Sequence, residues 1–517
     1  MRKTTSQMAA ICTTVALQLA ACCSSTSAPV CDGIAEEAPS DAVIDPILDS
    51  RSADSDFVIS SRLMAPLLCN EGDQTTPLAG FLPGTNQIVL GWVNEPATWE
   101  SSQCQKTCGQ EELADTAFSL LPVDGDAQTA DLHYVGENQA GSQWSPDLAV
   151  SPYGGFAIVW QEGGWVKISS EGGWLEDPTD MTVKARIFDA QGEAVTDEIV
   201  LDVLPAEDAD LTGVRPKVVA LMDGAYVVFW EWPCPDNLAA CPAKSETTGT
   251  PKIVLWSRLE PDGQPSVPVP LSDCFQEHVY FGGAAPLGGS DFVAVWEESN
   301  GELSPPPLSG PCQRGFSLRI VRGDTPEPEF RLTGPLWDWK SGPNVFPSGI
   351  AEGFVLVWSA HRTDAGDLPE ISQFMGVMGM LFDGNGNALT SSIPIVSGLN
   401  PGDLIHWSPT IQRFSDNRFL LTYHDHPSQL DQPFTFTVIL DQNLSPVGPK
   451  VMHGAECGYA YPGVSTVLSE ERVGVFWRGL CPVEEILSNE PCAEHTSCLT
   501  GAILTIDDLL GQSVSDL

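Results

Sequence analysis

Ionisable side chains recur just after apolar runs that end in an aromatic residue. Glu231, Glu298, His361 and His426 each follow such a run by one to three residues. Two carboxyl groups about 5 to 10 Å apart are sufficient to hydrolyse a glycosidic bond. These positions therefore predict a rim of polar groups that could bind a ligand or, as an alternative, act on a glycan.

Tryptophans gather in the connections around the same runs. The phrase "EGGW" occurs twice, ending at Trp165 and at Trp174. Loop tryptophans stack on sugar rings or anchor protein partners, and the alternative is that they cover the packed ends of strands. The candidate ligand-binding tryptophans are Trp165, Trp174, Trp232, Trp337 and Trp339.

Two short motifs resemble metal sites without completing one. In "YHDHP", His424 and His426 could reach one ion, but no third ligand is evident. "DGNGN" begins like a calcium loop at Asp383, yet Pro394 stands where the bidentate Glu belongs, so a turn is favoured. We expect no metal and no cofactor.

The chain contains no linear catalytic signature. G-x-S-x-G, H-E-x-x-H and the P-loop pattern are all missing. From this we expect a protein that is not an enzyme, although a hydrolase built from rim carboxylates stays open as the rival hypothesis.

The elements that must position these residues come from a repeat. Seven apolar runs without polar alternation recur about every 54 to 70 residues, which indicates strands buried on both faces. Their aromatic anchors are Trp92, Trp160, Trp230, Trp296, Trp358, Tyr423 and Trp477. We expect all seven to be packing residues.

Each run is preceded by a proline and a turn and is followed by further strand patterns. A proline lacks the N–H of a ladder position, so it is expected at the start of a strand. The prolines are Pro77, Pro146, Pro216, Pro286, Pro347, Pro409 and Pro462. Four antiparallel strands repeated seven times predict an all-β, seven-bladed β-propeller over 56–517. A strand over Asp56 to Met64 is expected to complete the last blade and close the ring.

The repeats resemble those of large secreted bacterial proteins of adhesin and haemolysin type and of delta-type bacterial lipoproteins. The resemblance rests on "RPKVVALMDGAYVVFW" followed by "LWSRLEPDG", and on "VKARIFDAQG". It implies the propeller architecture over most of the chain and says little about function.

The first residues have the plan of a secretory signal, with Arg2 and Lys3 before an apolar stretch. The sequence "LAAC" ending at Cys22 resembles the lipobox of bacterial lipoproteins. The resemblance implies removal of 1–21, lipidation of Cys22 and a lipid anchor in the outer membrane of the cell envelope. The small, acidic and proline-bearing composition that follows predicts a flexible tether over 22–55. An unlipidated secretory signal and a membrane anchor are the alternatives.

The remaining cysteines indicate disulfides, since an exported chain meets an oxidising environment. Close spacing favours Cys104 with Cys108 and Cys234 with Cys241, and Cys274 with Cys312 would join two long connections; zinc is the weaker alternative. Pairing stays open for Cys23, Cys31, Cys69, Cys457, Cys481, Cys492 and Cys498.

The net charge of −45 argues against nucleic acid as a partner, because such a surface repels phosphates. We expect a monomer whose contact with the membrane is its lipid anchor. The leading hypothesis is a non-catalytic binding or scaffold module that holds a glycan or a surface protein on its long connections.

Overall fold

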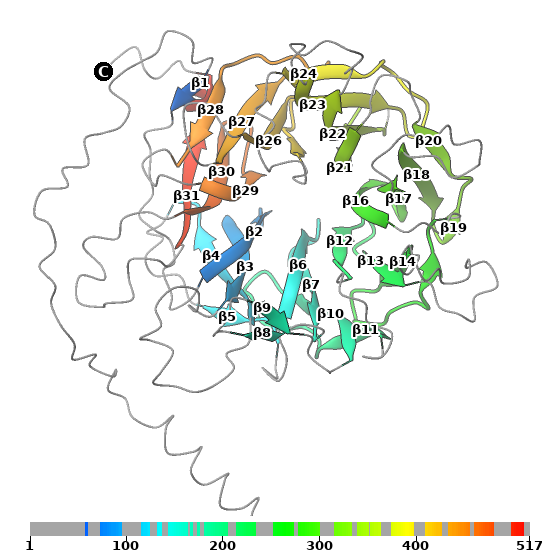
Figure 1. The fold of residues 1–517 in the computed structure, drawn as a ribbon. Helices are drawn as coiled ribbons and strands as arrows, with labels where there is room; N and C mark the ends of the chain where they lie inside the picture. Colours follow the sequence, from blue (N-terminus) through cyan, green and yellow to red (C-terminus); the bar gives the residue numbers. More distant parts are fainter. Residues whose placement is uncertain are drawn as a thin grey trace, which may run out of the picture.

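The protein is a seven-bladed β-propeller whose sheets are arranged around a central axis (Figure 1). This computed structural model describes residues 57–59, 73–95, 115–124, 132–136, 143–163, 166–168, 173–175, 180–204, 214–233, 252–272, 278–299, 315–332, 339–350, 352–362, 374–397, 409–425, 433–454, 460–479 and 498–510. The predicted fold class and blade number are confirmed.

Each blade is a meander whose strands follow chain order from the axis outward. The innermost strands are β2 (Asp73–Leu82), β6 (Gln143–Val150), β12 (Lys217–Ala220), β16 (His278–Gly288), β21 (Trp339–Pro347), β25 (Thr410–Arg413) and β29 (Ala460–Val467). The second strands are β3 (Gln87–Glu95), β7 (Phe156–Glu162), β13 (Tyr226–Pro233), β17 (Asp291–Ser299), β22 (Phe354–Arg362), β26 (Phe419–Asp425) and β30 (Arg472–Gly479).

The outer strands complete the blades and are shorter at the rim. The third strands are β4 (Asp115–Pro122), β10 (Met181–Phe188), β14 (Lys252–Leu259), β18 (Gly315–Arg322), β23 (Phe374–Phe382), β27 (Phe434–Leu440) and β31 (Cys498–Thr505). The outermost strands are β5 (His133–Tyr134), β11 (Ile199–Leu204), β15 (Val269–Pro270), β19 (Thr325–Pro326) with β20 (Phe330–Leu332), β24 (Ile393–Ser397) and β28 (Lys450–His453). A hairpin of β8 (Val166–Ile168) and β9 (Gly173–Leu175) lies in the connection between β7 and β10.

The aromatic anchors are core residues, as predicted. The side chains of all seven are at most 3% exposed, because each second strand is packed between the sheets of two neighbouring blades. One cluster, for example, packs Phe229 and Trp256 of the third blade against Phe292 and Trp296 of the fourth. Burial on both sheet faces explains why these strands are continuously apolar.

The ring does not close in the predicted way. The N-terminal strand β1 (Phe57–Ile59) pairs in parallel with β28, at the outer edge of the sixth blade. Among the described residues the seventh blade has three strands, and β31 is followed by the short helix α2 (Ile506–Leu509). Closure instead comes from side-chain packing between the seventh and first blades.

The helix α2 replaces the turn expected after β31. The Thr505 hydroxyl accepts a hydrogen bond from the Asp508 N–H, and the Asp508 carboxylate accepts one from the Thr505 N–H. This capping box favours a helical turn. Ile506 and Leu509 then pack into the core that joins the sixth and seventh blades.

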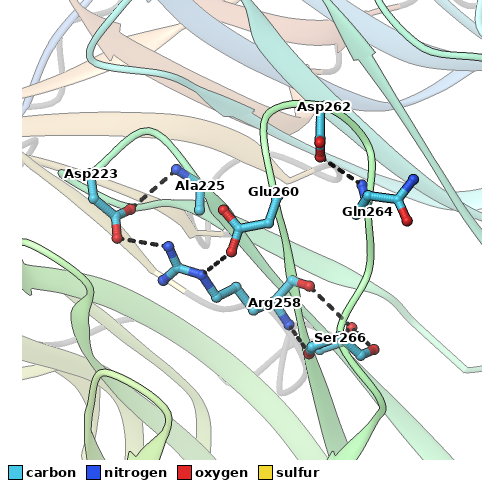
Figure 2. A network of polar contacts seen from close by, with 8 residues as sticks. Asp223, Ala225, Arg258, Glu260, Asp262, Gln264 and Ser266 are labelled. Carbon is cyan, nitrogen blue, oxygen red and sulfur yellow. Dashed lines mark hydrogen bonds and ion pairs between the residues drawn. The ribbon is translucent and has the colours of Figure 1, made fainter.

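One face of the ring is formed by short hairpin turns, and we call it the hairpin face. Figure 2 shows how the third blade is tied there: the Arg258 guanidinium lies 2.8 Å from Asp223 Oδ2 and 2.6 Å from Glu260 Oε1. Turns also join between blades, since the Tyr153 hydroxyl donates to the Met222 carbonyl. The hairpin face is therefore fixed within and between blades.

Candidate functional site

The opposite face carries the long connections, and we call it the loop-rich face. It is the face on which the second strands end, at Glu95, Glu162, Pro233, Ser299, Arg362, Asp425 and Gly479. The innermost strands begin at the same face, because they are antiparallel to the second strands. Residues after the anchors and residues at the starts of the innermost strands therefore meet there.

The innermost strands are interrupted opposite the anchors by β-bulges that contain proline. Thr76, Ser145 and Gly342 precede such prolines and have left-handed φ values of 54°, 48° and 57°. A bulge in an edge strand accommodates a residue that lacks an N–H and re-aims its neighbours. The expected place for proline at a strand start is therefore wrong for these blades.

Two of the predicted repeat prolines, Pro347 and Pro286, do not lie in the bulge of their blade. Pro343 occupies the bulge of the fifth blade, whereas Pro347 lies further along β21, paired with Phe354. In the fourth blade Gly282 is the extra residue, and Pro286 is paired with Phe292. Spacing alone could not separate a proline in the bulge from one later in the strand.

The residue after the anchor fastens one blade to the next in three places. Gln161 Oε1 accepts a hydrogen bond from the Val214 N–H at 2.9 Å. Glu231 Oε1 accepts one from the Phe281 N–H at 3.0 Å, and His424 Nε2 accepts one from the Gly463 N–H at 2.9 Å. We call this contact the interblade latch. It satisfies a backbone N–H of the next innermost strand or of the residues just before it.

A cluster of polar side chains lies where the third and fourth blades meet. The Arg215 guanidinium lies over the Tyr280 ring, 5.4 Å from its centroid. Tyr280 of β16 is paired in register with Glu297 of β17, and it is 38% exposed. Glu231 lies inside this seam, with its Oε2 atom 3.9 Å from Lys252 Nζ. The inner-rim cluster therefore consists of Arg215, Glu231, Lys252, Tyr280 and Glu297.

The charged groups of this cluster shift the pKa values of Glu231 and Tyr280. Burial raises the pKa of Glu231, and the nearby cations Lys252 and Arg215 partly offset this. Burial also raises the pKa of Tyr280; Arg215 lowers it, while Glu231 and Glu297 raise it further. Tyr280 therefore carries its proton at neutral pH and needs a neighbouring base to release it.

A second unusual carboxyl lies on the same face in the first blade. Asp115 is the first residue of β4, and burial raises its pKa to about 6. Its Oδ1 atom is buried and has no hydrogen-bond partner within the described part of the chain. This carboxyl therefore exchanges its proton near neutral pH.

The predicted site residues fall into three groups. Glu231 and Trp232 are buried, 2% and 7% exposed, with Trp232 in the core between the second and third blades. The structure gives only the strand positions of Trp174 in β9, Glu298 in β17, Trp339 in β21 and His361 in β22. Trp165, Trp337 and His426 lie outside the described residues, as do Cys22 and the predicted disulfide residues Cys104, Cys108, Cys234, Cys241, Cys274 and Cys312.

The structure brings together some of these residues and adds others that the sequence analysis missed. Trp339 and His361 are register partners at the start of the fifth blade. Arg215, Tyr280 and Asp115 were not predicted. The one available signal was the position of Arg215 directly before Pro216, equivalent to Thr76 and Ser145 before their prolines.

The metal motifs have ordinary structural roles where they are described. Asp383 Oδ1 accepts the N–H groups of Asn385 and Asn387, so this carboxylate closes a turn. His424 Nε2 is used in the interblade latch. Within the described ranges, no three His, Cys, Asp or Glu side chains are grouped to hold an ion. No helix in those ranges is long and apolar enough to cross a membrane.

Comparison with known proteins shows likeness in fold alone. No family model and no curated protein matches the chain. A Dyadobacter fermentans protein of unknown function is 13% identical with a TM-score of 0.42, covering 72% of this chain and 96% of its own. An α-L-arabinofuranosidase from Fusarium graminearum is 9% identical with a TM-score of 0.40, covering 86% and 97%. The NanB sialidase from Streptococcus pneumoniae is 9% identical with a TM-score of 0.42, covering 85% and 69%.

The expectation that the protein is not an enzyme is wrong. Solved structures of similar fold include an α-L-arabinofuranosidase, an α-L-arabinanase and sialidases, so the fold itself is compatible with catalysis. A propeller collects its functional side chains from several blades, so the lack of a linear motif gives no ground for excluding catalysis. At such low similarity these proteins show no substrate for this chain.

Proposed function

We propose that the protein is a hydrolase that acts on a glycan at the inner-rim cluster. The observation that carries the proposal is the exposed Tyr280, paired in register with Glu297 and covered on its ring by the Arg215 guanidinium. These side chains come from two blades and stand on a rigid sheet framework, which is how loop-rich faces of propellers can assemble a site.

The chemistry assigned to this cluster is nucleophilic displacement at the anomeric carbon. The Tyr280 oxygen bonds to this carbon as the glycosidic C–O bond breaks, and the leaving oxygen takes the proton that Glu297 received from Tyr280. Water, deprotonated by Glu297, then displaces Tyr280, which regains its proton. Tyrosine replaces the usual carboxylate nucleophile in some glycoside hydrolases. The raised pKa of Tyr280 means that its phenol needs a base, and Glu297 is the register partner that would take the proton. Arg215 supplies a positive charge beside the ring, suited to an acidic group or to oxygen that gains negative charge.

The test is to incubate the full chain with a panel of glycans and to measure the reducing sugar that cleavage releases. Tyr280→Phe and Glu297→Gln are expected to lower turnover by about 100-fold or more. Tyr134→Phe is the matched control, because Tyr134 is 42% exposed on β5, the outermost strand of the first blade. The proposal fails if no glycan is cleaved, or if Tyr280→Phe and Glu297→Gln match the parent.

Holding the glycan is assigned to tryptophans of the loop-rich face. Trp174 belongs to the β8/β9 hairpin and Trp165 directly precedes it, in the connection that follows β7. A Trp165→Ala, Trp174→Ala double variant is expected to weaken glycan capture and leave the free energy of unfolding nearly unchanged. Equal capture by the variant and the parent would exclude this role.

We also propose an exported, lipid-anchored protein, supported by "LAAC" at Cys22 after a charged and apolar start. Mass spectrometry of the mature N-terminus should find a diacylated Cys22, and an unmodified N-terminus at another residue would refute it. Non-reducing peptide mapping should find Cys104 joined to Cys108 and Cys234 to Cys241, whereas free thiols there would refute the proposed disulfides.

A further inference from the structure

We propose that Glu231 is a positioning residue that holds Arg215 and Tyr280 against each other. The inference rests on the proposed function of the inner-rim cluster and gives that site its supporting residue. Glu231 is 2% exposed, so it acts through its neighbours and does not contact a glycan.

Glu231 contacts the chain next to both members of the pair. Its N–H donates to the Val214 carbonyl at 2.9 Å, and Val214 directly precedes Arg215. Its Oε1 accepts from the Phe281 N–H at 3.0 Å, and Phe281 directly follows Tyr280. One residue of the third blade thus fixes the backbone on either side of the Arg215–Tyr280 contact.

The backbone of Arg215 needs such support. Its φ of 39° lies in the left-handed region, which a long side chain adopts only where its surroundings impose it. Val214 is held at both polar groups, since its N–H donates to Gln161 Oε1 and its carbonyl accepts from Glu231. The two latching residues therefore hold the backbone next to Arg215, just before β12, where its guanidinium reaches Tyr280.

The latch itself does not require a carboxylate. Gln161 and His424 accept the equivalent hydrogen bonds without a negative charge. A buried carboxylate is unfavourable unless it is paired, and Lys252 Nζ lies 3.9 Å from Glu231 Oε2. The latch alone therefore does not account for a carboxylate at this position.

The group that feels this charge is the Tyr280 phenol. Burial raises the pKa of Tyr280, and Arg215 lowers it. Glu231 raises it further, as does Glu297, the register partner of Tyr280. Lys252 and Lys217 face Glu231 from the same blade and moderate its charge. Glu231 thus both places Tyr280 and helps to keep its proton until Glu297 removes it.

Two substitutions in the full chain separate placement from charge. Glu231→Gln keeps an acceptor for the Phe281 N–H and removes the charge, whereas Glu231→Ala removes both. His424→Gln is the matched control, because it changes the equivalent latch between the sixth and seventh blades. The titration of Tyr280 is followed by ultraviolet difference spectra between each protein and the same protein carrying Tyr280→Phe.

Glu231→Gln is expected to lower the pKa of Tyr280, and His424→Gln to leave it unchanged. Glu231→Ala is expected to increase the rate of Tyr280 nitration, because the ring loses its fixed contact with Arg215. An unchanged titration in Glu231→Gln would overturn the role of the charge. If Glu231→Ala does not fold, Glu231→Met, which fills the same space without an acceptor for the Phe281 N–H, takes its place in the nitration measurement. An unchanged nitration rate in a folded Glu231→Ala would overturn the positioning role.

Neither readout depends on a glycan. Failure of the glycan screen would refute the proposed hydrolase. The Tyr280 titration and nitration would still test the role of Glu231 independently. If a substrate is found, Glu231→Gln should shift the pH profile of turnover, while His424→Gln should not.

Discussion

Removal of the Phe476 ring should weaken the seam that closes the propeller more than removal of the N-terminal strand. Phe476 of β30 is 1% exposed and packs with Trp92 and Leu90 of the first blade. A Cβ atom on Gly474 or Gly501 would lie 2.8 Å or 2.3 Å from this ring. These glycines make room for the ring and offer no side chain to fill the space it leaves.

The two magnitudes can be compared directly. Phe476→Ala should cost about 3 to 5 kcal/mol, towards the upper end because the cavity cannot collapse. β1 contributes three register pairs with β28. Its hydrogen bonds add about 0.5 to 1.5 kcal/mol each, and ordering each residue costs about 1 to 2 kcal/mol. A chain that begins at residue 60 should therefore lose about 1 kcal/mol or less.

Urea unfolding of the parent, the truncated chain, Phe476→Ala and Phe476→Leu measures this difference. Phe476→Leu is the control that retains most of the apolar volume, and it should cost less than half as much as Phe476→Ala. If the truncated chain is as unstable as Phe476→Ala, the ring depends on β1 and the closure described above is wrong.

Three further predictions concern buried groups. Burial lowers the pKa of His453 to about 3 and that of His424 to about 4, so the unfolded chain binds their protons first as pH falls below about 6.5. The contribution of each histidine to the free energy of unfolding should be constant above that pH. Below it, the free energy of unfolding should fall by up to about 1.4 kcal/mol for each histidine with every unit by which the pH is lowered. A His453→Gln variant whose stability has the same pH slope as the parent would contradict this. The pH dependence of stability contributed by Asp115 has the opposite sign. Burial raises its pKa to about 6, so the folded chain loses stability as pH rises from about 4 to 6. Asp115→Asn should be more stable than the parent at pH 7 in urea unfolding, and equal stability would show that the charge is solvated. Trp296→Ala should cost about 3 to 5 kcal/mol, since its side chain is fully buried, and a loss below about 1 kcal/mol would contradict its role as an anchor.

The sequence predicted the blades well because each blade repeats the same physical requirement. A second strand packed between two sheets must be apolar on both faces, and the aromatic residue that ends it fills the space between blades. Trp160 and Trp230 show this in consecutive blades, where both are completely buried. The number of such runs therefore gave the number of blades.

Ring closure could not be predicted in the same way. The pattern of β1 is three apolar residues, which fit the outer edge of any blade. Its partner was decided by the exposed edge of β28, and the "TIDDL" segment after β31 formed a capped helical turn in place of a turn into another strand. Both outcomes depend on tertiary contacts that a repeat alignment does not contain.

For the candidate site, the sequence predicted only the face of the propeller on which it lies, and not the residues that come together there. Glu231 was predicted as a ligand residue, but the sequence could not show that its side chain turns into the seam between blades. Arg215 and Tyr280 are far apart in the chain, and their contact is made from a backbone with left-handed φ at Arg215. Hydrophobic periodicity carries no information on such a local backbone conformation.

The position of β1 also determines how a mechanical load would enter the molecule. A pull on the residues before Phe57 acts first on three residue pairs at the outer edge of the sixth blade. Once they separate, the load is passed along the chain to β2, next to the axis. The β1–β28 pairing can therefore separate under load while all seven blades stay packed.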